Sequence, residues 1–134
     1  MKEPITDLAD MLRQLRPRRQ PGEYVFATLP DGAHLPPAAV GWFRETEGVS
    51  VVLPAADADR LGLTAAFRAA WITLEVPSAL AGVGLTAAVA GALAAAGIAC
   101  NVIAAVRHDH LFVPLDRGGE AVAVLLRLQA NAGR

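Results

Sequence analysis

The segment CNVIAAVRHDHLFVP, residues 100–114, holds two histidines and an aspartate within an otherwise apolar stretch. His108 and His110 are two residues apart, and on a strand such residues point to the same side, so both imidazoles could bind one zinc ion. A zinc site needs three or four ligands, however, and the third histidine, His34, lies in a distant proline-rich loop. A catalytic His–Asp pair would also need a nucleophile within hydrogen-bond reach. The sequence favours a hairpin between two buried strands, because an aspartate at the centre of a short polar connection is ordinary turn chemistry.

The composition describes a chain with a large apolar fraction and almost balanced charge. Hydrophobic residues make up 54% of the 134 residues, charged residues make up 19%, and the formal net charge is −1. A protein that binds duplex nucleic acid uses many basic side chains to replace condensed cations, so this balance argues against that class. Little net repulsion keeps copies apart, and we therefore expect a homo-oligomer.

The N-terminus and the cysteine content predict a cytoplasmic protein. Residues 1–4, Met-Lys-Glu-Pro, lead into a charged segment rather than the apolar core of a signal peptide. Cys100 is the only cysteine, which excludes a disulfide within the chain and fits a reducing compartment. Its neighbours are apolar and none is cationic, so we expect a small buried hydrophobic side chain rather than a nucleophile.

A run without charged residues extends from Pro77 to Val106 and is long enough to span a bilayer. Four glycines and several polar residues break it, alanine dominates it, and strongly apolar leucine-type content is not continuous. The run divides more naturally into a loop, a helix that is buried on more than one side, and a strand. We therefore expect no membrane partner.

The second half of the chain predicts the order strand, helix, strand, strand, helix. Alternation in WITLEV places Ile72, Leu74 and Val76 on one face of the first strand. Apolar residues at helical spacing follow, and Gly97 can end that helix. The predicted elements are a strand at 71–76, a helix at 85–96, strands at 98–106 and 111–115, and a helix after Asp116.

The first half has a similar order, but a proline-rich loop replaces its first helix. Its predicted elements are a strand at 24–29, a loop at 30–37, a hairpin of strands at 40–46 and 49–53, and a helix at 54–61. Each half approximates a ferredoxin-like β-α-β-β-α-β unit, an α+β fold of antiparallel sheets with helices on one face. We place the division between residues 1–68 and residues 69–134. The second half ends before its last strand. Its sheet edge must therefore be covered by the strand at 24–29, by a second molecule, or by a short N-terminal helix that Thr6 can cap and that Pro17 ends, with Arg18 and Arg19 at its C-terminal end.

The stretch ITLEVPSALAGVGLTAAVAGALAAAGIACNVIAAVRHDHLFVP, residues 72–114, resembles the ACT domain. The shared features are a strand, a glycine-containing loop, an alanine-rich helix ending in AGI, and a strand that opens with a polar residue. YVFATL and FRETEGVSVVLP in the first half are also similar to this family, in particular to small bacterial proteins with two ACT-like halves. The resemblance implies side-by-side pairing of modules, amino-acid binding and a regulatory role, as in the related modules of aspartate kinases.

In ACT domains a ligand binds between the loop after the first strand and the start of the second strand, which the resemblance places at residues 77–86 and 101–103. Glycines in the loop would let the backbone approach a ligand, the helix start could receive a carboxylate, and Asn101 could bind an amino or carboxyl group. The loop has no residue to neutralise an ammonium group, so Glu75 or the other half would have to do so. Alternatively, the glycines allow close helix–strand packing and Asn101 satisfies a buried backbone group. The predicted ligand-binding residues are Ser78, Val83, Gly84, Leu85, Thr86, Asn101 and Ile103.

These observations predict a regulatory protein that binds a small ligand, in the first instance an amino acid, with no catalytic residue, cofactor or metal. A second hypothesis is an assembly module that binds no ligand, because the small-residue helix and the missing last strand suit pairing with another molecule. A third is a metal-dependent protein that uses His108 and His110.

Overall fold

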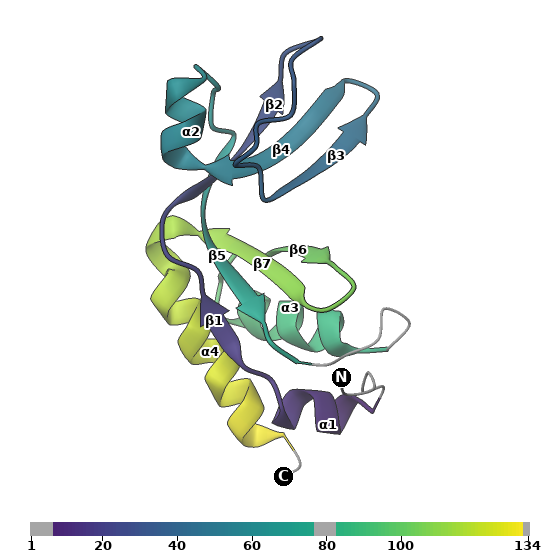
Figure 1. Ribbon diagram of the computed structural model, residues 1–134. Coiled ribbons are helices and arrows are strands. Elements are labelled where there is room, and N and C mark those ends of the chain that lie inside the picture. Colours follow the sequence, from purple (N-terminus) through teal and green to yellow (C-terminus); the bar gives the residue numbers. More distant parts are fainter. Residues whose placement is uncertain (1–6, 77–82, 133–134) are drawn as a thin grey trace.

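Residues 7–76 and 83–132 are described by the computed structural model, which Figure 1 shows with its elements labelled. The strands form one antiparallel sheet with the order β3-β4-β2-β5-β7-β6, and β1 also pairs with β5. In the described part of the chain, no helix is long and apolar enough to cross a membrane. The elements are α1 (Leu8–Arg13), β1 (Pro17–Arg19), β2 (Tyr24–Leu29), β3 (Gly41–Glu45), β4 (Gly48–Pro54), α2 (Ala55–Arg60), β5 (Phe67–Leu74), α3 (Leu85–Ala95), β6 (Asn101–Ala104), β7 (Asp109–Pro114), the 3-10 helix η1 (Leu115–Arg117) and α4 (Gly118–Asn131).

The first half has a ferredoxin-like order in which a loop takes the place of the first helix. β2 pairs with β4 on one side and with residues 67–69 of β5 on the other, and β3 pairs with β4. α2 packs against β2 and β4. Residues 30–40, where a first helix would lie, form turns and no helix. The prolines of this segment predict that result, because proline lacks the N–H that a helix interior needs.

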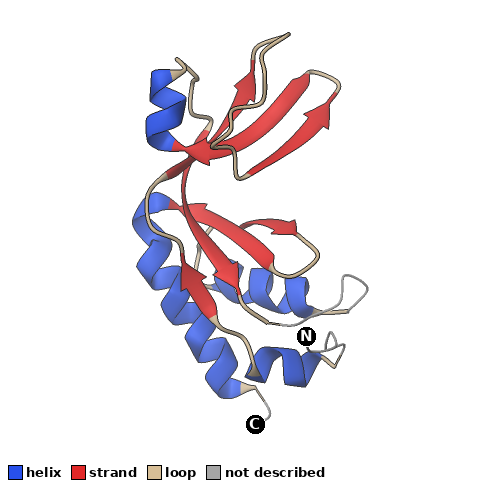
Figure 2. Ribbon diagram, viewed as in Figure 1, coloured by secondary structure: helices blue, strands red, loops and turns tan. Residues whose placement is uncertain are grey.

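The second half has the same order and takes its last strand from the N-terminal segment. β5, β7 and β6 are its sheet, and α3 and α4 lie on one face of it, as Figure 2 shows. β1 pairs with residues 72–74 of β5, and the Gln20 N–H donates to the Trp71 carbonyl at 2.8 Å. The N-terminal segment thus covers the open edge that the sequence predicts, and it supplies hydrogen-bond partners that an edge strand would lack.

Both halves share β5. Its residues 67–69 pair with β2 and its residues 72–74 pair with β1, while β7 runs along the other edge from residue 69 to residue 74. One half therefore ends, and the other begins, within a single strand. The predicted α+β fold, with ferredoxin-like halves, an antiparallel sheet and helices on one face, is confirmed.

The helix-covered face of the sheet carries the main apolar core. Alternation puts Ile72 and Leu74 of β5 on this face with Leu111 of β7, and all three are almost completely buried. Met11 and Leu15 of the N-terminal segment are fully buried in the same cluster. That segment therefore contributes core side chains, as well as a strand, to the second half. A smaller cluster lies under α2 in the first half and comprises Val25, Ala27, Leu29, Val51, Leu53, Ala55 and Ala58.

The opposite face of the sheet is concave and aromatic. Phe112 of β7 contacts Phe26 of β2, with ring centroids 5.3 Å apart, and Trp71 of β5, with centroids 6.1 Å apart. Edge-to-face and stacked rings of this kind stabilise a fold beyond the area that they bury. Phe112 therefore connects strands of both halves. The cluster on this face comprises Tyr24, Phe26, Val52, Phe67, Ala69, Trp71 and Phe112.

The sheet curls along its strand order. β3 and β6 are at opposite ends of that order, yet a Cβ placed on Gly41 of β3 would lie 3.7 Å from the Ile103 Cδ1 of β6. In Figure 1 the two halves accordingly face each other across the concave side. The aromatic cluster lies on the inner side of this curve.

Gly118, the first residue of α4, is packed too tightly for a side chain. A Cβ there would lie 2.9 Å from the Ala70 Cβ on β5 and 2.6 Å from the Arg19 Cζ on β1. We expect Gly118→Ala to lower the free energy of unfolding by about 1–3 kcal/mol, because β5 would have to shift. A Cβ at Gly119 would meet no atom within 4 Å, so Gly119→Ala should be neutral or stabilise α4 by up to about 1 kcal/mol. Urea unfolding of both variants tests this contact, and equal effects would contradict it.

Candidate functional site

α3 begins next to Gly84, whose backbone is in the left-handed region at φ 101°. Glycine adopts this conformation without the strain that a Cβ adds. Gly84 has no side chain to cap the helix, so the first N–H groups of α3 find no side-chain acceptor in their cap residue. Val83 and Thr86 are exposed, whereas Leu85 is buried in the core and can offer a ligand only its backbone. Ser78 lies outside the described residues.

α1 packs against this start of α3. A Cβ on residue 84 would lie 3.0 Å from the Leu8 Cδ2, so Leu8 covers one side of Gly84. A larger residue at position 84 would strain the backbone and also press on α1. Loss of ligand binding in such a variant could therefore result from the strained backbone at residue 84 or from a displaced α1. Asn101 is therefore the more specific position to replace.

Asn101 and Ile103 of β6 point to the concave face. Their cross-strand partners on β7 are Phe112 and His110, and partners in register share a face. Both side chains are exposed, and the Asn101 Nδ2 donates to the Phe112 carbonyl at 3.4 Å. The structure thus brings Asn101 and Ile103 together but places the Leu85 side chain on the other, helix-covered side of the sheet.

The hairpin between β6 and β7 contains the His108-Asp109-His110 motif. A hydrogen bond from the Ala105 N–H to the His108 carbonyl, at 3.1 Å, closes its turn, and β7 begins at Asp109. A hairpin is present as predicted, but the place of the motif within it is wrong: Asp109 and His110 belong to β7 because they pair with β5 and β6, and the turn lies before them. Among residues 7–76 and 83–132, no three His, Cys, Asp or Glu side chains are grouped so as to hold a metal ion.

His110 forms a polar contact within the aromatic concave face. The Trp71 Nε1–H donates to His110 Nδ1 at 3.0 Å, and the Thr73 Oγ1 lies 3.3 Å from the same nitrogen. An indole nitrogen only donates, so His110 Nδ1 accepts and the proton of the ring is on Nε2. Burial lowers the pKa of His110, nearby His108 lowers it further, and Asp109 opposes both effects. His110 is therefore neutral near pH 7 and holds the Trp71 ring in place.

Asp109 is a buried carboxylate at the start of β7. The residue is 8% exposed, and its register partners, Leu74 of β5 and Ala104 of β6, place it on the helix-covered face. Burial raises the pKa of the Asp109 carboxyl, and the two neighbouring histidines lower it in part. A cation beside such a group would favour its charged form. Asp109 is thus a candidate for binding a cationic group. The turn predicted at this position gave no indication that the carboxylate is buried.

Cys100 has the environment of a structural residue. It is partly buried and packs against the core under α3 and α4. Burial raises the pKa of its thiol, so the nucleophilic thiolate is disfavoured.

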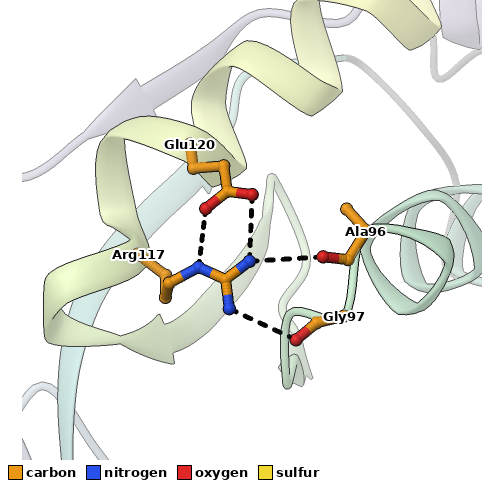
Figure 3. Close-up of polar contacts among 4 residues, drawn as sticks. All are labelled: Ala96, Gly97, Arg117 and Glu120. Carbon is orange, nitrogen blue, oxygen red and sulfur yellow. Dashed lines mark hydrogen bonds and ion pairs between the residues drawn. The ribbon is translucent and has the colours of Figure 1, made fainter.

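Arg117 joins the end of α3 to the start of α4, as Figure 3 shows. Its guanidinium donates to the carbonyls of Ala96 at 3.2 Å and Gly97 at 3.4 Å, and to both carboxylate oxygens of Glu120 at 2.6 and 2.9 Å. The hydrogen bonds between the two side chains raise the pKa of Arg117 and lower that of Glu120. Arg117 thus satisfies carbonyls that a helix end leaves without partners, and it holds α3 in position. An R-x-x-E spacing at a helix start is the sequence signal that could have revealed it.

Two different family models, each described as an ACT domain, match the chain at residues 3–70 and 66–127. The chain belongs to the ACT domain family. The two matched regions overlap at residues 66–70, within and just before the strand β5 that the ACT halves share. ACT domains are regulatory modules, and many of them bind small ligands and form oligomers.

Solved structures share this ACT architecture over most of the chain. A protein of unknown function from Vibrio cholerae, described as a possible transport protein, is 39% identical with a TM-score of 0.82, covering 91% of this chain and 95% of that chain. A protein from Agrobacterium tumefaciens is 20% identical with a TM-score of 0.64, covering 87% and 90%. The aspartokinase alpha and beta subunits are 12% identical with a TM-score of 0.59, covering 84% and 95%. The last two likenesses concern the fold alone. No curated protein matches the chain.

Proposed function

We propose that this ACT protein is a regulatory protein that binds an amino acid and has no catalytic activity of its own. Support comes from the ACT assignment of both halves, together with a helix start at Gly84 that has no side-chain cap. The N–H groups at such a start can bind the carboxylate of a ligand. We further propose that the protein acts in the cytoplasm as a homo-oligomer.

We also propose that the chain divides into residues 1–68 and 69–134. All residues of the proposed ligand site then belong to the second half. The backbone of Leu85 and Thr86 would bind the ligand carboxylate. Asn101 and Ile103 face the other side of the sheet, so in the proposed homo-oligomer they would reach this ligand from a second copy of the chain, where Asn101 would supply a side-chain hydrogen bond. The exposed Ile103 would contact the apolar part of the ligand. The complete proposed set is Ser78, Val83, Gly84, Leu85, Thr86, Asn101 and Ile103.

An amino-acid ligand also needs a partner for its ammonium group. Glu75 is already paired with Arg18, whose Nη1 lies 3.3 Å from the Glu75 Oε1. Asp109 is in register with Leu74, the last residue of β5, from which the chain leads towards α3. We assign this role to Asp109, because an ammonium group would offset the cost of burying its charge.

Asn101→Ala is expected to weaken binding of the amino acid about tenfold or more, which corresponds to one lost hydrogen bond to a charged group. A thermal-shift screen of the twenty amino acids identifies the ligand first, because a ligand that binds only the folded state raises the Tm with its occupancy. Asn131→Ala, at the exposed end of α4, is the matched control and should leave the shift unchanged. A flat response to every amino acid would contradict the proposal, as would equal shifts in the two variants.

A ligand-free assembly module is the second candidate, and β3 is the feature that favours it. β3 is an end strand of the sheet, and its Trp42 and Phe43 are 51% and 73% exposed. An end strand with exposed aromatic side chains can pair with another copy. Sedimentation equilibrium tests this function. Self-association that no amino acid alters would support it, and a monomer at all concentrations would exclude it.

A further inference from the structure

The loop that replaces the first helix of the first half leaves a cavity beside α2. The cavity has a volume of about 310 Å³ and lies between residues 29–37, at and after the end of β2, and residues 60–63, at and after the end of α2. Ligand-binding pockets in proteins begin at roughly this size. At about 30 Å³ for each water of the liquid, the cavity has room for roughly ten non-hydrogen atoms.

The wall of the cavity is mostly apolar, and the one charged side chain among its described residues is a cation. Leucine, proline and alanine make up most of it, and Leu35 and Leu61 are still 41% and 45% exposed, although burial of such side chains is favourable. Among the described residues that line it, Arg60 and His34 alone have polar side chains, and none is acidic. A ligand would therefore place an apolar body between the leucines and an anionic group beside Arg60.

Arg60 retains donors for such an anion. Its Nη2 donates to the Asp57 Oδ1 at 2.6 Å, which uses one of the five N–H groups of the guanidinium. Asp57 is not part of the cavity wall, so the carboxylate that balances Arg60 stands outside the space for the ligand. A carboxylate in the cavity could bind the remaining N–H groups and form a charge-assisted pair.

We propose that this cavity binds an aliphatic monocarboxylate of about ten non-hydrogen atoms, with its chain between the leucines and its carboxylate on Arg60. An α-amino acid fits less well, because no described side chain of the wall is acidic and none could form an ion pair with its ammonium group. The site lies in the first half, apart from the one proposed at α3. Either site can therefore fail its test without affecting the other.

Isothermal titration of sodium octanoate into the full chain tests the proposal, because octanoate has the required length and charge. We expect saturable binding of one octanoate for each chain. Octylammonium, which has the same chain and the opposite charge, should bind at least about tenfold more weakly, since it would meet Arg60. The absence of saturable octanoate binding, or equal binding of both ions, would overturn the proposal.

Charge and volume variants test the position of the ligand. Arg60→Gln should weaken octanoate binding about two- to fivefold, as expected for an exposed ion pair, and Asp57→Asn should strengthen it by releasing Arg60. Arg68→Gln, which removes an exposed arginine outside the wall, is the control and should leave affinity unchanged. Ala33→Trp should fill the cavity and abolish binding without a change in Tm. Equal affinity of the Arg60 and Arg68 variants, or full binding by the folded Ala33 variant, would overturn the assignment.

Discussion

Removal of residues 1–19 is expected to unfold the second ACT half. The deletion takes β1 away from residues 72–74 of β5 and removes Met11 and Leu15, which are fully buried, from the core under α3 and α4. Burial of two such side chains contributes about 3–6 kcal/mol, which is comparable with the whole stability of many domains, about 5–15 kcal/mol. Loss of amide-proton dispersion for residues of α3, β6 and α4 in NMR spectra would be the observed result.

A peptide that covers residues 7–20 should restore the fold when it is added to the shortened chain. The same peptide with Met11→Asp and Leu15→Asp is the matched control, because buried charges without partners are strongly unfavourable. This control peptide should not restore the fold of the shortened chain. A shortened chain that keeps native dispersion and stability without any peptide would contradict the role assigned to the N-terminal segment.

Phe112→Ala is expected to lower the free energy of unfolding by about 3–5 kcal/mol, the usual cost of removing a buried ring. Phe112 is 2% exposed, and its ring contacts Phe26 of the first half and Trp71 of the shared strand. The substitution would leave a cavity where the two halves join. Chemical denaturation followed by tryptophan fluorescence measures the change.

Phe43→Ala removes the same type of side chain from an exposed position and is the matched control. Phe43 is 73% exposed on β3, so its replacement should change stability by no more than about 0.5 kcal/mol in the monomer. Similar effects of the two substitutions would contradict the view that the aromatic cluster connects the halves.

Local patterns in the sequence were sufficient to predict much of the second half. The helix predicted at 85–96 is observed at Leu85–Ala95, because Gly97, at φ 73°, ends it as its position indicates. The alternation in WITLEV correctly placed Ile72, Leu74 and Val76 in the core. Such elements are encoded by periodicity and end signals that lie within the element itself.

Local sequence patterns could not predict β1. Pro17, Arg18 and Arg19 read as the end of a helix, and no alternation distinguishes three residues as a strand. They are extended because the edge of β5, distant in sequence, needs partners for its backbone. Pairing between distant segments can override local preference in this way.

The strand predicted at 98–106 was too long for a similar reason. β6 covers only Asn101–Ala104. Ile98 belongs instead to the close of α3, where its N–H donates to the Leu93 carbonyl at 2.9 Å, and Val106 is exposed in the turn. An apolar run cannot by itself distinguish a strand from the packed residues that flank it.

The candidate sites depend on tertiary contacts that the sequence could only partly indicate. The resemblance to ACT domains indicated Asn101 and Ile103, whereas the burial of Leu85 depended on how α3 packs on the sheet. The contact between Trp71 and His110 required knowledge of the strand register. The cavity beside α2 exists because residues 30–40 form no helix, and its size follows from packing alone.

NMR mapping of amide shifts tests the central claim, that this ACT protein binds an amino acid at the start of α3, most directly. The amino acid with the largest thermal shift is titrated into isotope-labelled full-length protein. We predict saturable changes at residues 84–86 and 101–103, and weaker ones in the Asn101→Ala variant. Saturable changes confined to the first half, or no changes at any concentration of the amino acid, would contradict the account.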